Sequence, residues 1–223
     1  MKYYILANGE GTRWGNFKGV PKQLIEIEGE TILHRMIRLL RYEGVKKEDI
    51  FICGPFEDED AQSIMTKSPT KREVFEEIAR LAKEPFTILY GDCYYTDECI
   101  NTIVHRPINK YDEFLNAGAN LNTGCTWPEG YAHRCEDWQW WLDKMTELNT
   151  KIKEGKIDYP KDWYLHFWLL DDLEALDRFP DDFEYDHDHD VFWCDKTDDF
   201  DYPEDLEKFC QHTGLKCTNK EEK

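Results

Sequence analysis

The start of the chain combines a short apolar segment with a glycine-rich one. Residues 3–7 read Tyr-Tyr-Ile-Leu-Ala, which predicts a buried strand, and Asn8-Gly9-Glu10-Gly11-Thr12-Arg13 follows at once. Glycines at the end of a strand let the backbone approach a ligand and turn its N–H groups toward phosphate oxygens. Arg13 and Lys22, at the rim of such a loop, would add the fixed positive charge that a triphosphate requires. The segment therefore predicts a nucleotide-phosphate loop.

This loop differs from the two common phosphate-binding loops. It lacks the Lys-Ser/Thr ending of the Walker loop, and Arg13 leaves it without the third glycine of the dinucleotide-binding pattern. Taken alone, Gly9-Glu10-Gly11 is also compatible with an ordinary turn after an edge strand. The cations at Arg13 and in Pro21-Lys22 favour the phosphate loop over that alternative.

Strand and helix patterns alternate beyond the loop. Residues 32–42 and 71–83 carry apolar side chains at helical spacing, and residues 49–54 and 86–90 read as buried strands. This alternation favours an α/β fold with a mostly parallel mixed sheet flanked by helices. The face of the second helix that we expect to be buried consists of Val74, Phe75, Ile78, Leu81 and Ala82.

Composition limits the possible partners and surroundings of the chain. The 223 residues carry a net charge of −19, which disfavours a nucleic-acid surface or an anionic membrane as a partner. No apolar run is long enough to span a bilayer, and the first residues do not read as a signal peptide, so we expect a cytoplasmic protein. The eight cysteines form no CxxC pair, and in such a compartment we expect free thiols rather than disulfides or a zinc site.

Three segments together carry a family resemblance. They read Leu6-Ala7-Asn8-Gly9-Glu10-Gly11-Thr12-Arg13, then Pro21-Lys22, then Gly29-Glu30-Thr31-Ile32-Leu33. This pattern resembles the nucleotidyltransferase superfamily that activates sugar phosphates and phospho-alcohols, and the Pro-Lys-Gln triplet is most similar to its cytidylyltransferase branch. Asn8 and Trp14 depart from the usual residues at their positions. The resemblance implies a Rossmann-like nucleotidyltransferase fold of the kind that GT-A glycosyltransferases also have.

The resemblance also implies the roles of individual residues. Arg13 and Lys22 would be catalytic. The residues implied in nucleotide binding are Leu6, Ala7, Asn8, Gly9, Glu10, Gly11, Thr12, Arg13, Lys22 and Gly91. Asp92 would bind the catalytic Mg²⁺, although a Gly-Asp turn after a strand is common without any metal. Because ligands of parallel sheets bind at the carboxyl ends of the strands, Gly9 and Asp92 are expected to meet in one crevice.

A closing motif near the C-terminus resembles the segment in which the family places its second metal ligand. Asp201 precedes Pro203 by two positions and would be that ligand, with Asp199 as the alternative. A solvated acidic run before a helix is the structural interpretation of the same residues. Tyr202 replaces the usual Thr, so the helix that begins at Pro203 should lose a good N-cap.

The resemblance covers one domain, residues 1–217, followed by a flexible tail at 218–223. Residues 1–92 would form the nucleotide-binding half, and residues 93–217 the half that binds the acceptor and completes the metal site. The tryptophan-containing helix expected at 136–153 reads as core. We interpret His166 as a packed histidine, and the segment 186–190 as an acidic loop in preference to a metal site.

The expected activity is transfer of a nucleoside monophosphate from a nucleoside triphosphate, with CTP favoured, to a small phosphorylated acceptor such as a sugar phosphate or phospho-alcohol. Pyrophosphate would leave, and Mg²⁺ would be the cofactor. One alternative is a GT-A-type glycosyltransferase that uses a nucleotide-sugar, with Asp186-His187-Asp188 or Asp199-Phe200-Asp201 as its D-x-D motif. Another is a nucleotide-binding relative without catalysis. The base, the acceptor and the oligomeric state stay open.

Overall fold

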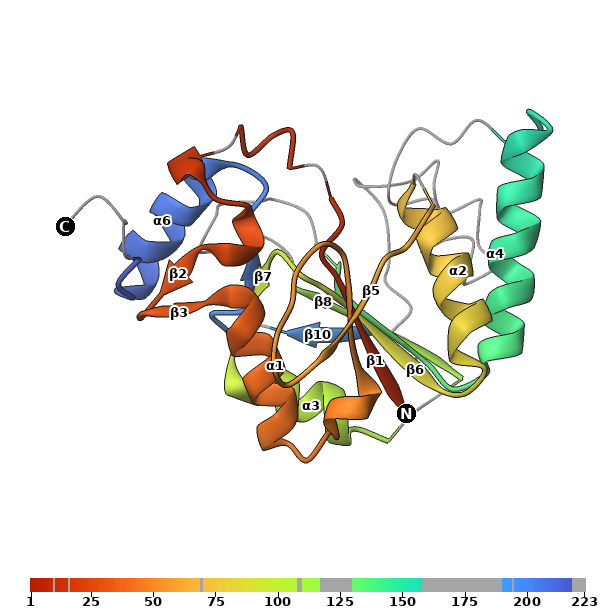
Figure 1. Ribbon diagram of the computed structural model, residues 1–223, viewed down its shortest axis with the longest axis horizontal. Helices are drawn as coiled ribbons and strands as arrows, with labels where there is room; N and C mark the ends of the chain where they lie inside the picture. The colour runs from red at the N-terminus through yellow and green to blue at the C-terminus, as the bar shows by residue number, and fades with distance from the viewer. Residues whose placement is uncertain are drawn as a thin grey trace.

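A seven-stranded sheet lies at the centre of the computed structural model (Figure 1), with the strand order β10-β8-β9-β6-β1-β4-β5. The structure describes residues 1–9, 11–15, 17–68, 70–107, 110–116, 130–157, 190–193 and 195–217. The strands of this sheet are β1 (Lys2–Leu6), β4 (Ile50–Cys53), β5 (Gln62–Ile64), β6 (Phe86–Tyr90), β8 (Tyr111–Asn116), β9 (Gly130–Cys135) and β10 (Asp190–Trp193).

Six of these strands run in one direction. β1 pairs in parallel with β4 and β6, β4 with β5, and β8 with β10. β9 lies between β6 and β8 and is antiparallel to both. The predicted mostly parallel mixed sheet is therefore confirmed, and the carboxyl ends of β1, β4 and β6 meet at one edge of it.

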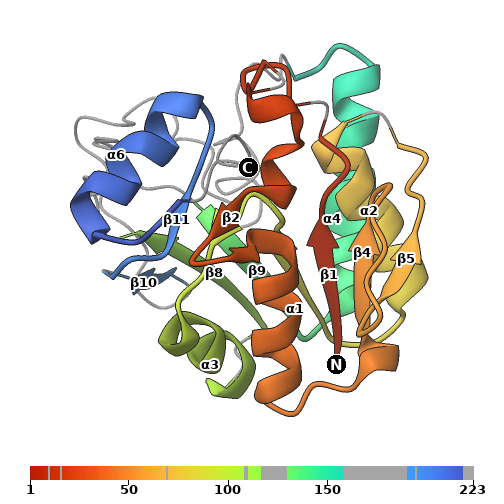
Figure 2. The ribbon, with the colours of Figure 1, turned by 60° about the vertical axis from the view of Figure 1, so that its left-hand side comes forward.

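Helices cover both faces of the sheet. α1 (Ile32–Tyr42) and α3 (Asp97–His105) pack on one face, and α2 (Lys71–Ala82) and α4 (Trp138–Lys153) on the other (Figure 2). Short 3-10 turns occur at η1 (Phe17–Gly19), η2 (Lys22–Leu24) and η3 (Lys47–Asp49). The helix positions and the strands at residues 50–53 and 86–90 agree with the sequence predictions.

Two predicted helix faces were tested by burial. On α4 the tryptophan-containing stripe is core as expected, because Trp141, Met145 and Leu148 are buried. On α2 the prediction was wrong for Leu81, whose residue is 52% exposed, while Ala79 is buried in its place. The error arises because Leu81 lies at the edge of the apolar arc of α2, outside the buried face, whereas Ala79 packs in the core that α2 shares with the sheet.

A third, smaller core holds the C-terminal helix α6 (Pro203–Thr213) against the start of the chain. Its buried members are Trp14, Ile25, Ile27, Ile32, Tyr94, Phe200, Leu206 and Phe209. Two short antiparallel pairs frame it: β2 (Glu26–Ile27) with β3 (Glu30–Thr31), and β7 (Cys93–Tyr94) with β11 (Asp198–Asp199). The second pair brings the segment at 199–201 beside the residues that follow β6.

The expectation that all cysteines are free is wrong for two of them. Cys210 and Cys217 form a disulfide, with 6.2 Å between their Cα atoms. The pairing arises because Gly214 ends α6 with a left-handed φ of 69° and turns the chain back toward Cys210. Cys53, Cys93, Cys99 and Cys135 are free and buried, and Cys125 and Cys194 lie outside the described residues.

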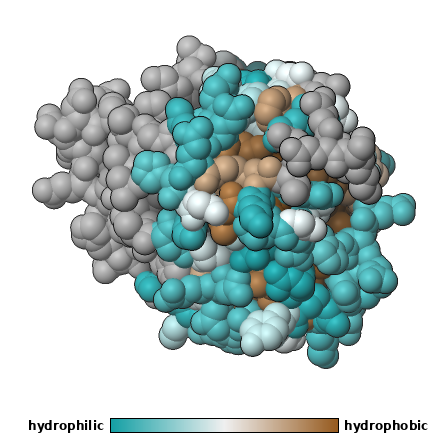
Figure 3. All heavy atoms as spheres, turned by 90° about the vertical axis from the view of Figure 1, so that its left-hand side faces the viewer, coloured by the Kyte–Doolittle hydropathy of each residue, from teal (hydrophilic) through white to brown (hydrophobic). Residues whose placement is uncertain are grey.

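Among the described residues on the face shown in Figure 3, polar and charged side chains predominate, and apolar side chains are visible in a smaller area near the middle. In the part of the chain that the structure describes, no helix has the length and apolar character needed to cross a membrane.

Candidate active site

Two glycines hold the carboxyl end of β1 in a narrow space. The Gly91 N–H donates to the Leu6 carbonyl oxygen at 2.9 Å, and the Ala7 N–H donates to the Cys53 carbonyl oxygen at 2.9 Å. A Cβ atom at Gly91 would overlap the Leu6 carbonyl oxygen, and one at Gly54 would overlap that of Ala7. The predicted binding residues Leu6, Ala7 and Gly91 are therefore part of the packed floor from which the loop emerges.

The glycine loop above this floor is open on one side. A Cβ atom at Gly9 would meet nothing within 4 Å, which leaves room for a ligand against the backbone. Gly11 has a φ of 59°, and its carbonyl oxygen accepts the Trp14 N–H at 3.0 Å. Thr12 is exposed. The Asn8 Nδ2 donates to Thr66 Oγ1 at 2.9 Å, so this unusual side chain ties the loop to the segment after β5.

Four of the predicted site residues form one charged network at the same edge of the sheet. Lys22 forms an ion pair with Asp92, and its Nζ lies 3.7 Å from Asp201 Oδ1. Arg13 forms an ion pair with the other oxygen of Asp201. Arg13 and Asp201 are 188 positions apart in the sequence. The structure thus brings together the two predicted cations and the two predicted metal ligands.

Lys22 is more enclosed than a rim residue. Its side chain is only 11% exposed, and its Nζ donates to the Phe200 carbonyl oxygen at 3.3 Å. Burial by itself lowers the pKa of the amine, but the carboxylate of Asp92, with further contributions from Asp201 and Asp199, raises the pKa of Lys22 above its ordinary value. The ammonium group therefore stays charged at neutral pH.

The acidic residues of the network suit a hard cation. Asp92 and Asp201 both approach the Lys22 ammonium, so their oxygens already converge on one positive charge. Mg²⁺ typically takes one or two protein carboxylates and completes its shell with water and substrate phosphates. Among the described residues no group of three or more His, Cys, Asp or Glu side chains is arranged to hold a metal. A two-carboxylate site is compatible with that finding.

The two candidates for the second metal ligand differ in their surroundings. Asp201 contacts both site cations through its side chain. Asp199 lies in β11, where its backbone pairs with Cys93, and its charge acts on Lys22. This arrangement favours Asp201 as the second metal ligand and keeps Asp199 as the alternative. The site thus contains three carboxylates, of Asp92, Asp199 and Asp201, and two cations, Arg13 and Lys22. These described side chains together carry one net negative charge.

Tyr202 is a neighbour of the site that the sequence did not indicate. The Arg13 guanidinium carbon lies 5.8 Å from the centre of its ring, and Tyr202 is 48% exposed. The side chain makes no capping hydrogen bond to α6, as predicted, although the Asp205 carboxylate accepts the Tyr202 N–H at 2.7 Å. In the sequence, a tyrosine at this position signals only the loss of a cap.

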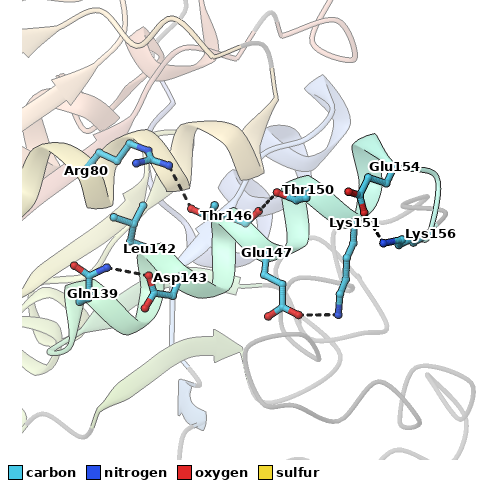
Figure 4. Close-up of a pocket in the computed structure, with 10 residues that line it drawn as sticks. All are labelled: Arg80, Gln139, Leu142, Asp143, Thr146, Glu147, Thr150, Lys151, Glu154 and Lys156. Atoms are coloured by element: carbon cyan, nitrogen blue, oxygen red, sulfur yellow. Dashed lines mark hydrogen bonds and ion pairs between the residues drawn. The ribbon is translucent and has the colours of Figure 1, made fainter.

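A hollow in the described surface lies along α4, beside Arg80 of α2 (Figure 4). Its lining residues pair with one another: Gln139 Nε2 donates to Asp143 at 2.9 Å, and the Lys151 and Glu147 side chains form an ion pair at 2.7 Å. None of the predicted site residues lines it. The candidate active site is therefore the edge of the sheet and not this hollow.

Some predictions lie outside the described residues. These are the nucleotide-binding role of Glu10, the packed state of His166, the acidic loop at 186–190 and the D-x-D alternative at Asp186-His187-Asp188. They stay predictions.

Comparison with known proteins places the fold. No protein-family model matches the sequence, and no curated protein matches it. Solved structures do resemble it. A protein assigned as a glucose-1-phosphate thymidylyltransferase, from Bacillus anthracis in complex with sucrose, has a TM-score of 0.63 and 12% identity, covering 95% of this chain and 94% of that one.

Two further structures have the same architecture. The CTP:phosphocholine cytidylyltransferase LicC of Streptococcus pneumoniae has a TM-score of 0.59 and 10% identity, covering 95% of this chain and 98% of its own. HddC of Yersinia pseudotuberculosis, complexed with GMP-PN, has a TM-score of 0.55 and 16% identity, covering 95% and 99%. The chain therefore has the Rossmann-like fold of sugar-phosphate and phospho-alcohol nucleotidyltransferases, as the sequence predicted.

Proposed function

We propose that the protein is a Mg²⁺-dependent nucleotidyltransferase that transfers a nucleoside monophosphate from a nucleoside triphosphate to a small phosphorylated acceptor and releases pyrophosphate. The observation that supports this most is the network of Arg13, Lys22, Asp92 and Asp201 beside the open backbone at Gly9. Cations, metal-binding carboxylates and a phosphate loop are the parts that such a transfer needs.

In this proposal the side chains mainly position and neutralise charge. The acceptor phosphate is already an anion, so its attack on the α-phosphorus needs no strong general base. Arg13 and Lys22 would bind the phosphates that leave, after giving up part of their contact with the two carboxylates. Asp92 and Asp201 would hold Mg²⁺, which would supply positive charge to the phosphate oxygens. A site whose described side chains carry one net negative charge needs such added positive charge to accept a triphosphate.

CTP is the triphosphate that we favour, on the resemblance of Pro21-Lys22-Gln23 to cytidylyltransferases. The fold likeness to a phosphocholine cytidylyltransferase is consistent with this choice and with a phospho-alcohol acceptor. Gln23 itself is only 4% exposed, so its side chain is not at the surface where a base could contact it. A sugar phosphate is the other acceptor class, in line with the thymidylyltransferase neighbour.

The test combines binding with turnover. A thermal-shift panel of CTP, UTP, GTP and ATP with Mg²⁺ selects the nucleotide, and pyrophosphate release is then measured with sugar phosphates and phospho-alcohols. Asp92→Asn, a neutral isostere, serves as the inactive control. Pyrophosphate release by the wild type, with none by Asp92→Asn, supports the proposal. Hydrolysis or transfer from a nucleotide-sugar, without pyrophosphate release from any triphosphate, would instead support the glycosyltransferase alternative, for which Asp199-Phe200-Asp201 supplies a D-x-D sequence.

A further inference from the structure

The N-cap of α6 differs from those of the other described α-helices. Thr31, Thr70 and Thr96 each accept a backbone N–H at the starts of α1, α2 and α3, and Asp137 does so for α4. Tyr202 stands at the same position of α6 and makes no side-chain cap. Threonine or aspartate would stabilise this helix start, so the tyrosine gives up a favourable local interaction. Departures of this kind are expected where a residue serves a site.

The ring of Tyr202 has a specific neighbour instead. The Arg13 guanidinium carbon lies 5.8 Å from the ring centre, within the range of a cation–π contact. The preceding residue, Asp201, forms an ion pair with the same guanidinium. Two adjacent residues before α6 therefore contact the tip of the Arg13 side chain, which is 55% exposed.

We propose that Tyr202 is a positioning residue that keeps the Arg13 guanidinium at the mouth of the site. The inference rests on the proposed function, in which Arg13 binds the leaving phosphates and Asp201 binds a divalent cation. Asp201 cannot serve both partners fully, so Arg13 loses part of its ion pair when Asp201 turns to the cation. The uncharged ring face does not compete for the cation or the phosphates, and it continues to hold the guanidinium in place.

Two substitutions separate this role from a structural one. Tyr202→Thr removes the ring and supplies the cap that α6 lacks, so it should raise the melting temperature by about 2–4 °C. It should also weaken binding of inorganic pyrophosphate in Mg²⁺ buffer by about 2- to 5-fold, the range for an exposed cation–π contact. Tyr202→Phe retains the ring face and should bind pyrophosphate within about twofold of the wild type. A merely structural residue would not lose affinity while gaining stability.

A double-mutant cycle with Arg13→Ala tests whether the ring acts through Arg13. Calorimetry with pyrophosphate should show that Tyr202→Thr has no further effect in the Arg13→Ala background. The inference is overturned if Tyr202→Thr binds pyrophosphate like the wild type, or if it weakens pyrophosphate binding equally in both backgrounds. In either case the proposed function still stands, provided that the wild type releases pyrophosphate from a triphosphate. If the wild type neither binds pyrophosphate nor releases it, the proposed function fails, and this inference fails with it.

Discussion

Replacing Lys22 by methionine removes one charge from the centre of the site and keeps most of the side-chain volume. Loss of a single preorganised electrostatic donor typically lowers turnover by roughly 100- to 1000-fold, or about 3–4 kcal/mol. We expect a loss of that size for Lys22→Met, because its ammonium contacts Asp92 and lies 3.7 Å from Asp201 at the predicted phosphate position.

The same substitution should have a smaller, metal-dependent effect on stability. Breaking a fully buried ion pair costs about 3–5 kcal/mol and a surface pair about 0–1 kcal/mol. The side chains of Lys22, Asp92 and Asp201 are 11%, 25% and 32% exposed, so an intermediate cost of about 1–2 kcal/mol is expected. Because Asp92 would then lose its cation and Asp201 would keep only Arg13, added Mg²⁺ should raise the melting temperature of the variant more than that of the wild type.

Pyrophosphate release and melting temperature over a Mg²⁺ titration measure both effects. Lys2→Met is the matched control, since Lys2 forms an ion pair with Glu84 at 2.8 Å at the opposite end of β1. Normal turnover in Lys22→Met would refute the assigned role of the ammonium group. An equal Mg²⁺ response in Lys22→Met, Lys2→Met and the wild type would refute the convergence of Asp92 and Asp201 on a metal.

Lys22 also gives a pH prediction. Its pKa in the folded protein is raised above its ordinary value of 10.5. The stabilisation from its charged form is therefore complete below about pH 10 and is lost as the pH rises through the raised pKa. Urea unfolding of the wild type and Lys22→Met should give a constant stability difference between about pH 7 and pH 9, which narrows above about pH 10.5. A stability difference that widens above this pH would contradict the raised pKa of Lys22.

Three further outcomes test other parts of the molecule. Asp201→Ala should raise the Mg²⁺ concentration needed for half-maximal turnover much more than Asp199→Ala; the reverse order would make Asp199 the ligand. Gly91→Ala should lower stability by about 1–3 kcal/mol in urea unfolding, because its Cβ would overlap a backbone oxygen of β1. Reduction of the Cys210–Cys217 disulfide by a dithiol should lower the melting temperature, and a Cys210→Ser/Cys217→Ser variant should be insensitive to the reductant.

Local sequence signals were sufficient for the central part of the fold. Apolar spacing at residues 32–42 and at 86–90 matches the ends of α1 and β6, because each element buries one continuous face or run. The approach of Arg13 and Lys22 to Asp92 and Asp201 also agrees with the sequence expectation. The meeting of the residues that follow β1 and β6 is a general property of parallel sheets, in which the residues after successive strands share one edge. Asp201 reaches the same place through the pairing of β11 with β7.

Other features depend on contacts that no local pattern encodes. β9 runs antiparallel to β6 and β8, and this direction is defined only by its pairing with those two strands. The low exposure of Lys22 depends on the Phe200 carbonyl group, which β11 brings back from the far end of the described chain. The contact between the Tyr202 ring and Arg13 likewise forms only because the chain returns to the site after β11.

The glycines around β1 fall into two kinds that a mutational scan would distinguish. At Gly54 and Gly91 any side chain meets the backbone carbonyl group of Ala7 or Leu6, at the end of β1, and no change of rotamer relieves a clash with backbone. At Gly9 an added Cβ atom meets open space, so the folded yield should tolerate alanine there even if ligand affinity does not. Abundance and activity measured in parallel would thus separate the glycines that backbone packing requires from the glycine that ligand binding requires.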